Sequence, residues 1–107
     1  MPTVPPRSSV QVGSRVVARA MTGVCDVGEL GLVHEVYDRG SDSHGYSIIF
    51  EGGRYDGFSP EELATMIVVT DEVEPTMIGY AFTNVITLCR DYEHGRFRFS
   101  SSRLSTP

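Results

Sequence analysis

Residues 46–70 read YSIIFEGGRYDGFSPEELATMIVVT, and this stretch decides the fold. Its first part, residues 46–51, is rich in aromatic and β-branched residues, which are typical of a strand. Gly52 and Gly53 then form a two-residue loop, because glycine tolerates the positive φ angles that tight hairpins require. Residues 54–58 pair back antiparallel on the first strand. The stretch therefore begins with a β-hairpin.

A helix start follows directly after the hairpin. Ser59 stands at the N-cap, Pro60 at the first helical position, and Glu62 three residues after the cap, which is the spacing of a capping box. Only one turn of helix fits before residues 66–70, MIVVT, which are apolar and β-branched. We expect these residues to form the last strand.

Two more strands are predicted before the hairpin. Residues 14–21, SRVVARAM, form a short strand that begins after Gly13. Residues 30–38, LGLVHEVYD, alternate imperfectly, which indicates a strongly bent strand with Gly31 at a bulge or a close backbone crossing. We expect its two faces to carry Leu30, Leu32, His34 and Val36 on one side, and Gly31, Val33, Glu35 and Tyr37 on the other. Residues 39–45, RGSDSHG, are a dense turn signal that connects this strand to the hairpin.

Five short strands with a single helical turn before the last one are the layout of a small SH3-like barrel over residues 12–70. Parallel strands would need crossover connections of a dozen or more residues, which this spacing does not allow. The predicted fold class is therefore mainly β, a five-stranded SH3-like barrel.

The remaining segments are predicted to be tails and an extension. Residues 1–11 and 100–107 have no apolar periodicity and are expected to be flexible. In the extension, residues 71–99, apolar residues recur at intervals of three and four, which predicts an amphipathic helix over about 83–94. We expect Thr83 to cap its start and Gly95 to follow its end, although the β-branched run 85–87 would equally suit a strand. Residues 96–99, RFRF, alternate strictly and can add an edge strand.

The charge is unevenly distributed along the chain. The formal net charge is −5, and residues 21–75 hold twelve acidic side chains against two arginines. Such a segment would repel a phosphate backbone and attract a cationic partner. The alternative is a solvated acidic surface that only keeps a small domain soluble.

Several function classes have no support in the residue pattern. The longest apolar runs are far shorter than the ~20 residues that cross a bilayer, and we read no secretory signal at the N-terminus. Three scattered histidines and two cysteines lack the spacing of a metal site or a nucleophilic pair, so we predict no metal, no cofactor and no catalytic residue. Cys25 lies in a glycine-bounded loop and is expected to be exposed, whereas Cys89 is expected to be buried. Two cysteines without a disulfide pattern suit a reducing cytosol, and we predict a cytoplasmic protein.

Residues 12–70 resemble the SH3-like barrels of the KOW and Tudor type, over roughly half of the chain. The matching stretches are Val12-Gly13-Ser14-Arg15-Val16-Val17, Gly28-x-x-Gly31-x-Val33, Tyr46-x-Ile48-x-Phe50 and Phe58-Ser59-Pro60-Glu61-Glu62-Leu63. The resemblance implies the fold and says little about function, because this barrel serves many activities.

Three functional subtypes of this fold can be compared with the chain. KOW modules carry basic residues around the glycine turn, where this chain has the acidic stretch 25–29. Tudor-like modules hold a methylated cation in an aromatic cage. The residue types for such a cage are Tyr37, Tyr46, Tyr55 and Phe58, with Asp38 and Asp56 adding charge. A plasmid-type dihydrofolate reductase is similar in outline, but Asp56 would repel its anionic cofactor.

We therefore predict a non-catalytic protein-interaction module that presents an acidic surface to a basic protein or peptide. The predicted partner-binding residues are Asp26, Glu29, Tyr37, Asp38, Asp42, Tyr46, Tyr55, Asp56 and Glu61, with the three tyrosines exposed. The first alternative is a nucleic-acid-associated KOW-like module that uses Arg15, Arg19, Arg96, Arg98 and Arg103. A small barrel oxidoreductase is the remote alternative. The C-terminal extension either caps the barrel or mediates a homodimer, because its apolar stripe needs a cover.

Overall fold

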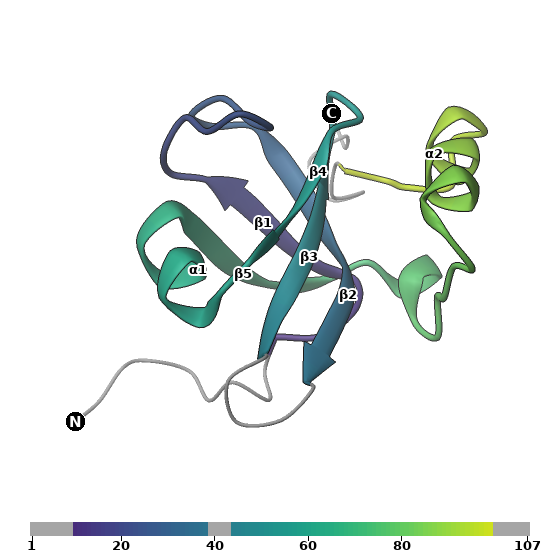
Figure 1. Ribbon diagram of the computed structural model, residues 1–107, viewed down its shortest axis with the longest axis horizontal. Coiled ribbons are helices and arrows are strands. Elements are labelled where there is room, and N and C mark those ends of the chain that lie inside the picture. The colour runs from purple at the N-terminus through teal and green to yellow at the C-terminus, as the bar shows by residue number, and fades with distance from the viewer. Residues whose placement is uncertain (1–9, 39–43, 100–107) are drawn as a thin grey trace, which may run out of the picture.

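Five antiparallel strands form one sheet in the order β4-β3-β2-β1-β5. The computed structural model describes residues 10–38 and 44–99 (Figure 1). The strands are β1 (Ser14–Ala18), β2 (Leu30–Asp38), β3 (His44–Phe50), β4 (Tyr55–Phe58) and β5 (Ile67–Val73). The helices are α1 (Pro60–Met66), the 3₁₀ helix η2 (Pro75–Met77) and α2 (Val85–Glu93). Within the described residues, no helix has the length and apolar character needed to cross a membrane.

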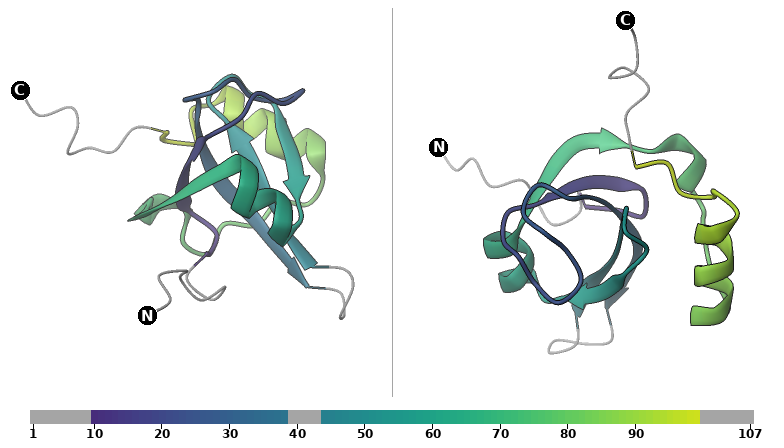
Figure 2. Two further views of the ribbon diagram at one scale, coloured as in Figure 1. Left: turned by 90° about the vertical axis from the view of Figure 1, so that its left-hand side faces the viewer. Right: turned by 90° about the horizontal axis from the view of Figure 1, so that it is seen from above.

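The sheet is strongly bent but open. Seen from above, its strands curve around a common centre, with α1 on one side and α2 on the opposite side (Figure 2). β4 and β5 are the two edges of the sheet, and α1 connects them. The prediction of a mainly β fold, with five strands and a short helix before the last, is confirmed. Closure into a barrel is not confirmed, because the strand order ends at these two edges.

The hairpin and the short helix form where local sequence predicts them. The hairpin loop holds three residues, one more than predicted: the Phe50 amide donates to the Arg54 carbonyl at 2.9 Å, and Gly53 closes the turn with φ +92°. At the start of α1, the Ser59 hydroxyl accepts from the Glu62 amide at 3.1 Å, and the Glu62 carboxylate accepts from the Ser59 amide at 2.9 Å. This reciprocal capping box turns the buried Leu63 toward the core.

The bend in β2 arises at His34 rather than at Gly31. The pairing of β2 with β3 shifts register between Val33 and Glu35. The close approach at Gly31 is to a side chain and not to the predicted backbone crossing, since a Cβ there would lie 2.8 Å from Cδ1 of Phe50. Because of the bulge, Glu35 lies opposite Ser47, and the His34 ring also reaches the Ser47 hydroxyl. His34 and Glu35 therefore lie on the same side of the strand, contrary to the predicted alternation.

The sheet is buried on both sides. The core inside the bend contains Val16, Ala18, Cys25, Val33, Tyr46, Ile48, Phe50, Phe58, Leu63 and Ile67. A second core, on the outer side, contains Leu32, Ile49, Met77, Leu88 and Phe97. The C-terminal extension supplies the last three of these, so it covers the outer faces of β2 and β3. Of the two expected roles of the extension, a cap on the barrel or a homodimer contact, this packing corresponds to the first, with an open sheet in place of the barrel.

The helix of the extension is slightly shorter than predicted. Asn84 caps it in place of Thr83, its side-chain oxygen accepting from the Thr87 amide at 3.1 Å, and Gly95 follows its end with φ +77°. The Tyr92 hydroxyl donates to the Glu51 carbonyl at 2.7 Å and joins α2 to the hairpin loop. Residues 96–99 form no strand, so the expected edge strand is wrong.

Arg15, on β1, ties the extension to the sheet. Its buried guanidinium donates to the Glu74 carboxylate and, at 2.8 Å, to the Arg98 carbonyl, and its Nε lies 3.6 Å from the Glu72 carboxylate. Burial acts to raise the pKa of Glu74, but hydrogen bonds from Thr76 and the charges of Arg15 and Arg98 hold this pKa below its usual range. The charge of Arg15 is therefore neutralised inside the protein.

Candidate binding groove

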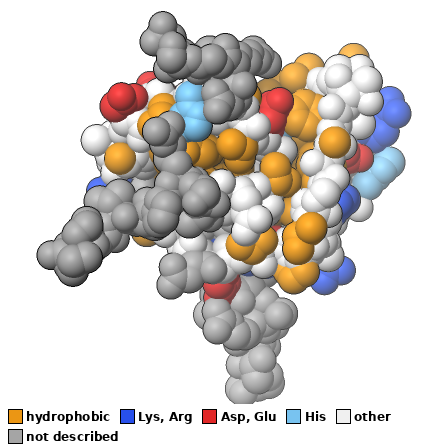
Figure 3. Space-filling view, turned by 90° about the horizontal axis from the view of Figure 1, so that it is seen from below, with side chains coloured by type: hydrophobic (Ala, Val, Ile, Leu, Met, Phe, Trp, Pro, Cys, Tyr) orange, Lys and Arg blue, Asp and Glu red, His pale blue; other side chains and the backbone are white. Residues whose placement is uncertain are grey.

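The predicted acidic residues lie on separate parts of the molecule. Asp26 and Glu29 belong to the β1–β2 loop, Asp56 to β4 and Glu61 to the first turn of α1. On the face seen in Figure 3, acidic side chains are dispersed rather than gathered in one patch. Asp38 ends β2, opposite His44, and Asp42 lies outside the described residues.

Glu29 has a structural role in the loop region. Its carboxylate accepts hydrogen bonds from the amides of Asp26 and Gly52, each at 2.9 Å. Glu51 accepts in the same region, from the Leu30 amide at 3.1 Å. These carboxylates join the β1–β2 loop to the hairpin loop, and Glu29 needs no external partner to account for its position.

The predicted aromatic residues divide between the two sides of the sheet. Tyr46 is 1% exposed in the inner core together with Phe58, so the expectation that Tyr46 is exposed is wrong. Tyr37 and Tyr55 are half-buried, and Tyr55 packs on the outer core. Period-two alternation explains the split, because Tyr46 and Tyr55 occupy opposite faces of paired strands. The four residues therefore do not form one cage.

A groove on the outer side brings together a different set of residues. It has a volume of about 240 Å³ and is lined by Val12, His34, Glu35, Val36, Tyr80, Ala81 and Phe82, which we call the outer groove. Hydrophobic side chains are prominent on the face of the molecule seen from below (Figure 3). β2 supplies three of the lining residues, and the segment between η2 and α2 supplies three more. The extension therefore builds one wall of the groove.

His34 is the buried polar group of the outer groove. It is 2% exposed, and its Nε2 lies 3.0 Å from the Ser47 hydroxyl. Its Nδ1 has no hydrogen-bond partner among the residues that the structure describes. The rings of Phe82 and Tyr55 pack edge-on against the imidazole, with centroids 5.2 and 6.3 Å away. This burial lowers the pKa of His34 to about 4, so the ring is neutral at pH 7.

Tyr80 anchors the other wall. Its hydroxyl donates to the Asp91 carboxylate at 2.7 Å, and its ring stacks on Phe82 with centroids 6.2 Å apart. Burial, followed by the hydrogen bond to Asp91 and the charge of that carboxylate, raises the pKa of Tyr80. The Arg96 guanidinium lies over the Tyr80 ring, 5.0 Å from its centroid. Because His34 is neutral, the Glu35 carboxylate is the charged group among the lining residues.

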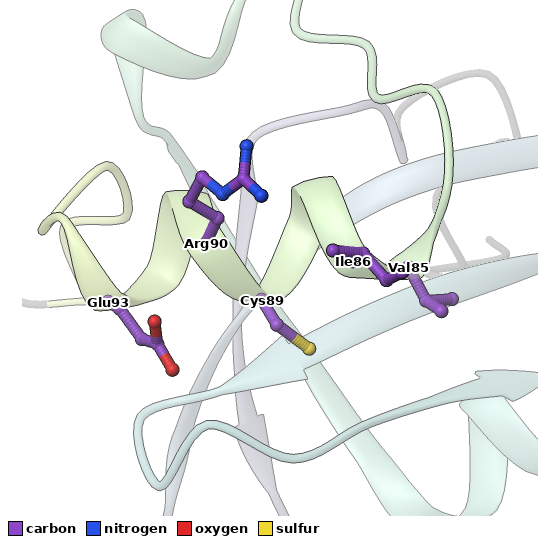
Figure 4. A pocket seen from close by; sticks show the side chains of 5 residues that line it. All are labelled: Val85, Ile86, Cys89, Arg90 and Glu93. Atoms are coloured by element: carbon purple, nitrogen blue, oxygen red, sulfur yellow. The ribbon is translucent and has the colours of Figure 1, made fainter.

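A second, shallower hollow lies on the outward side of α2. It has a volume of about 330 Å³ and is lined by Val85, Ile86, Cys89, Arg90 and Glu93 (Figure 4). Val85 and Ile86 are 49% and 67% exposed. The cysteine expectations are reversed by the fold: Cys89 is exposed here, whereas Cys25 is fully buried in the inner core.

Sequence reasoning missed the wall that the extension contributes. Tyr80, Ala81 and Phe82 belong to an apolar run, IGYAF at 78–82, and this run was the available signal. The alternation within β2 assigned Glu35 to the wrong face, because a bulge cannot be read from residue types alone.

Within residues 10–38 and 44–99, no three histidine, cysteine or acidic side chains group in a way that could hold a metal ion. No family model, curated protein or solved structure matches this chain.

Proposed function

We propose that the protein is a non-catalytic interaction module of the cytoplasm that binds a basic protein or peptide in the outer groove. Its body is an SH3-like barrel of the KOW and Tudor type, supported by the strong bend of the sheet and by the short helix between β4 and β5. The free thiols of Cys25 and Cys89 suit a reducing compartment. The observation that carries the proposal is an apolar and aromatic groove whose charged lining group is the Glu35 carboxylate.

Two features support a basic segment as the ligand. The net charge of −5 attracts cations at long range and raises the rate of encounter. Within the groove, Val12, Val36 and Phe82 offer apolar surface beside that carboxylate. A segment with alternating apolar and basic side chains would match both the negative charge and the apolar surface. The net negative charge of the chain thus acts in attraction, and the groove acts in binding.

Nucleic acid is the competing ligand class. Arg15 cannot contact a phosphate, because its guanidinium is buried against Glu74. Arg19 and Arg98 are exposed, but Arg96 lies against Tyr80. Arg103 lies outside the described residues. Of the arginines predicted for nucleic acid, the described residues therefore leave Arg19 and Arg98 for phosphate contacts, and affinity for nucleic acid depends on the number of such contacts.

The test is a titration of the ¹⁵N-labelled full chain, followed by amide chemical shifts. The probes are a pool of capped heptapeptides with central arginine or lysine and apolar neighbours, the same pool with central glutamate, and a single-stranded oligonucleotide. We expect shifts at the outer groove with the basic pool, loss of these shifts in Glu35→Arg, and retention in Glu93→Arg, which changes an exposed residue of α2 by the same charge. A response confined to the glutamate pool or the oligonucleotide, or no response to the basic pool, would refute the proposal.

A further inference from the structure

Two neighbouring lining residues of the outer groove carry an unpaired buried imidazole nitrogen and a carboxylate, and we propose that the groove recognises an arginine side chain of the partner. This inference rests on the proposed function and adds the residue type that is recognised. In this arrangement the guanidinium donates to Nδ1 of His34 and to the Glu35 carboxylate, and its flat face lies on the Phe82 ring.

The first argument is the unpaired nitrogen of His34. The ring lines the groove, is almost fully buried, and has a nitrogen without a partner among the described residues. Leaving a buried polar atom unpaired is costly, so a ligand that supplies the missing bond gains affinity. When Nε2–H donates to the Ser47 hydroxyl, Nδ1 is a hydrogen-bond acceptor. The ligand must then present a donor.

The second argument is the charge beside this acceptor. The bulge in β2 places Glu35 next to His34, with both residues adjacent to Ser47 on β3. A neutral acceptor and a carboxylate on adjacent residues favour a cation that carries several donors. Guanidinium has five N–H donors in a fixed plane, whereas the lysine ammonium is a compact and strongly hydrated point charge.

The third argument comes from the aromatic wall, which already holds a guanidinium of the protein itself. Arg96 lies over Tyr80, which in turn stacks on Phe82. Arginine stacks on aromatic faces and is more weakly hydrated than lysine, so the Phe82 ring suits an arginine better than a lysine. The groove volume of about 240 Å³ is several times the ~30 Å³ that one water occupies, which leaves room for a side chain. Phe82 is half-buried, and it must shift to let the ligand reach Nδ1.

The experiment compares three capped pentapeptides with the sequence Gly-Leu-X-Leu-Gly, where X is arginine, lysine or citrulline. Affinities are measured from amide shifts of the full chain at pH 7. We expect the arginine peptide to bind at least about tenfold more tightly than the other two, the loss expected for one charge-assisted hydrogen bond. Glu35→Gln should reduce arginine binding by a similar factor, and the matched exposed substitution Glu93→Gln should leave it unchanged.

A second readout tests the histidine separately from Glu35. Long-range ¹H–¹⁵N spectra of the imidazole report which nitrogen carries the proton, and we expect it on Nε2 with Nδ1 shifting when the arginine peptide binds. A proton on Nδ1, or equal affinity for the arginine and citrulline peptides, would overturn the inference. Equal affinity for arginine and lysine would overturn it too, while leaving the proposed function intact. If neither cationic peptide binds and the basic heptapeptide pool also gives no shifts, both proposals fail.

Discussion

Lowering the pH from 7 to 5 should destabilise this protein through His34. Burial lowers the pKa of His34 from 6.5 to about 4, so between these values the unfolded chain binds a proton that the folded chain does not. Stability therefore falls as the pH is lowered through this window. At pH 5 the loss relative to pH 7 amounts to about 2 kcal/mol, and it approaches about 3 kcal/mol below pH 4.

The assay is urea unfolding of the full chain, followed by circular dichroism at both pH values. His34→Phe keeps an aromatic ring against Phe82 and Tyr55 but cannot bind a proton, so its free energy of unfolding should change little between pH 7 and pH 5. His94→Asn, at the exposed end of α2, is the matched control and should retain the full decline. Glu74 does not interfere, because its lowered pKa costs stability only as the pH falls below about 4.5. Equal stability of the parent chain at the two pH values, or an unchanged decline in His34→Phe, would refute the reasoning.

Three further outcomes are expected. Glu74→Gln should destabilise the chain by about 3 kcal/mol in urea unfolding, because the buried charge of Arg15 loses its main partner; a change below about 1 kcal/mol would contradict this. Leu88→Ala should cost about 2–5 kcal/mol if the extension is packed on the sheet, and a surface-like cost below 0.5 kcal/mol would show that it is not. In native protein an uncharged maleimide should label Cys89 rapidly and Cys25 only on unfolding, as mass spectrometry can establish; rapid labelling of Cys25 would disprove its burial.

Local features of this fold were predictable because each depends on neighbouring residues. The capping box of α1 needs only Ser59 and Glu62, and it forms as predicted. The hairpin follows from a glycine pair between two β-prone segments, although its loop is one residue longer. The amphipathic helix of the extension was predicted from the spacing of Val85, Leu88, Cys89 and Tyr92. Leu88 and Tyr92 do face the sheet, whereas Val85 and Cys89 are exposed.

The candidate site was much less predictable, because burial depends on partners far away in the chain. Tyr46 was predicted to be an exposed partner-binding residue, yet it is buried in the inner core of the bent sheet. Cys25 lies in a glycine-bounded loop that folds over the inner core, and Cys89 lies on the side of α2 that faces away from the sheet. In each case the residue type and its neighbours in the sequence are compatible with both burial and exposure.

By itself, the sequence determined the strand-rich class, the place of the hairpin, the capping box of α1 and the negative charge, since these follow from short-range preferences and composition. Only the tertiary structure decided where a ligand can enter. A single extra residue in β2 moved His34 and Glu35 to the same side, and a distant segment brought Tyr80 and Phe82 against them. Such a groove exists through register and packing between separate segments, which no local pattern encodes.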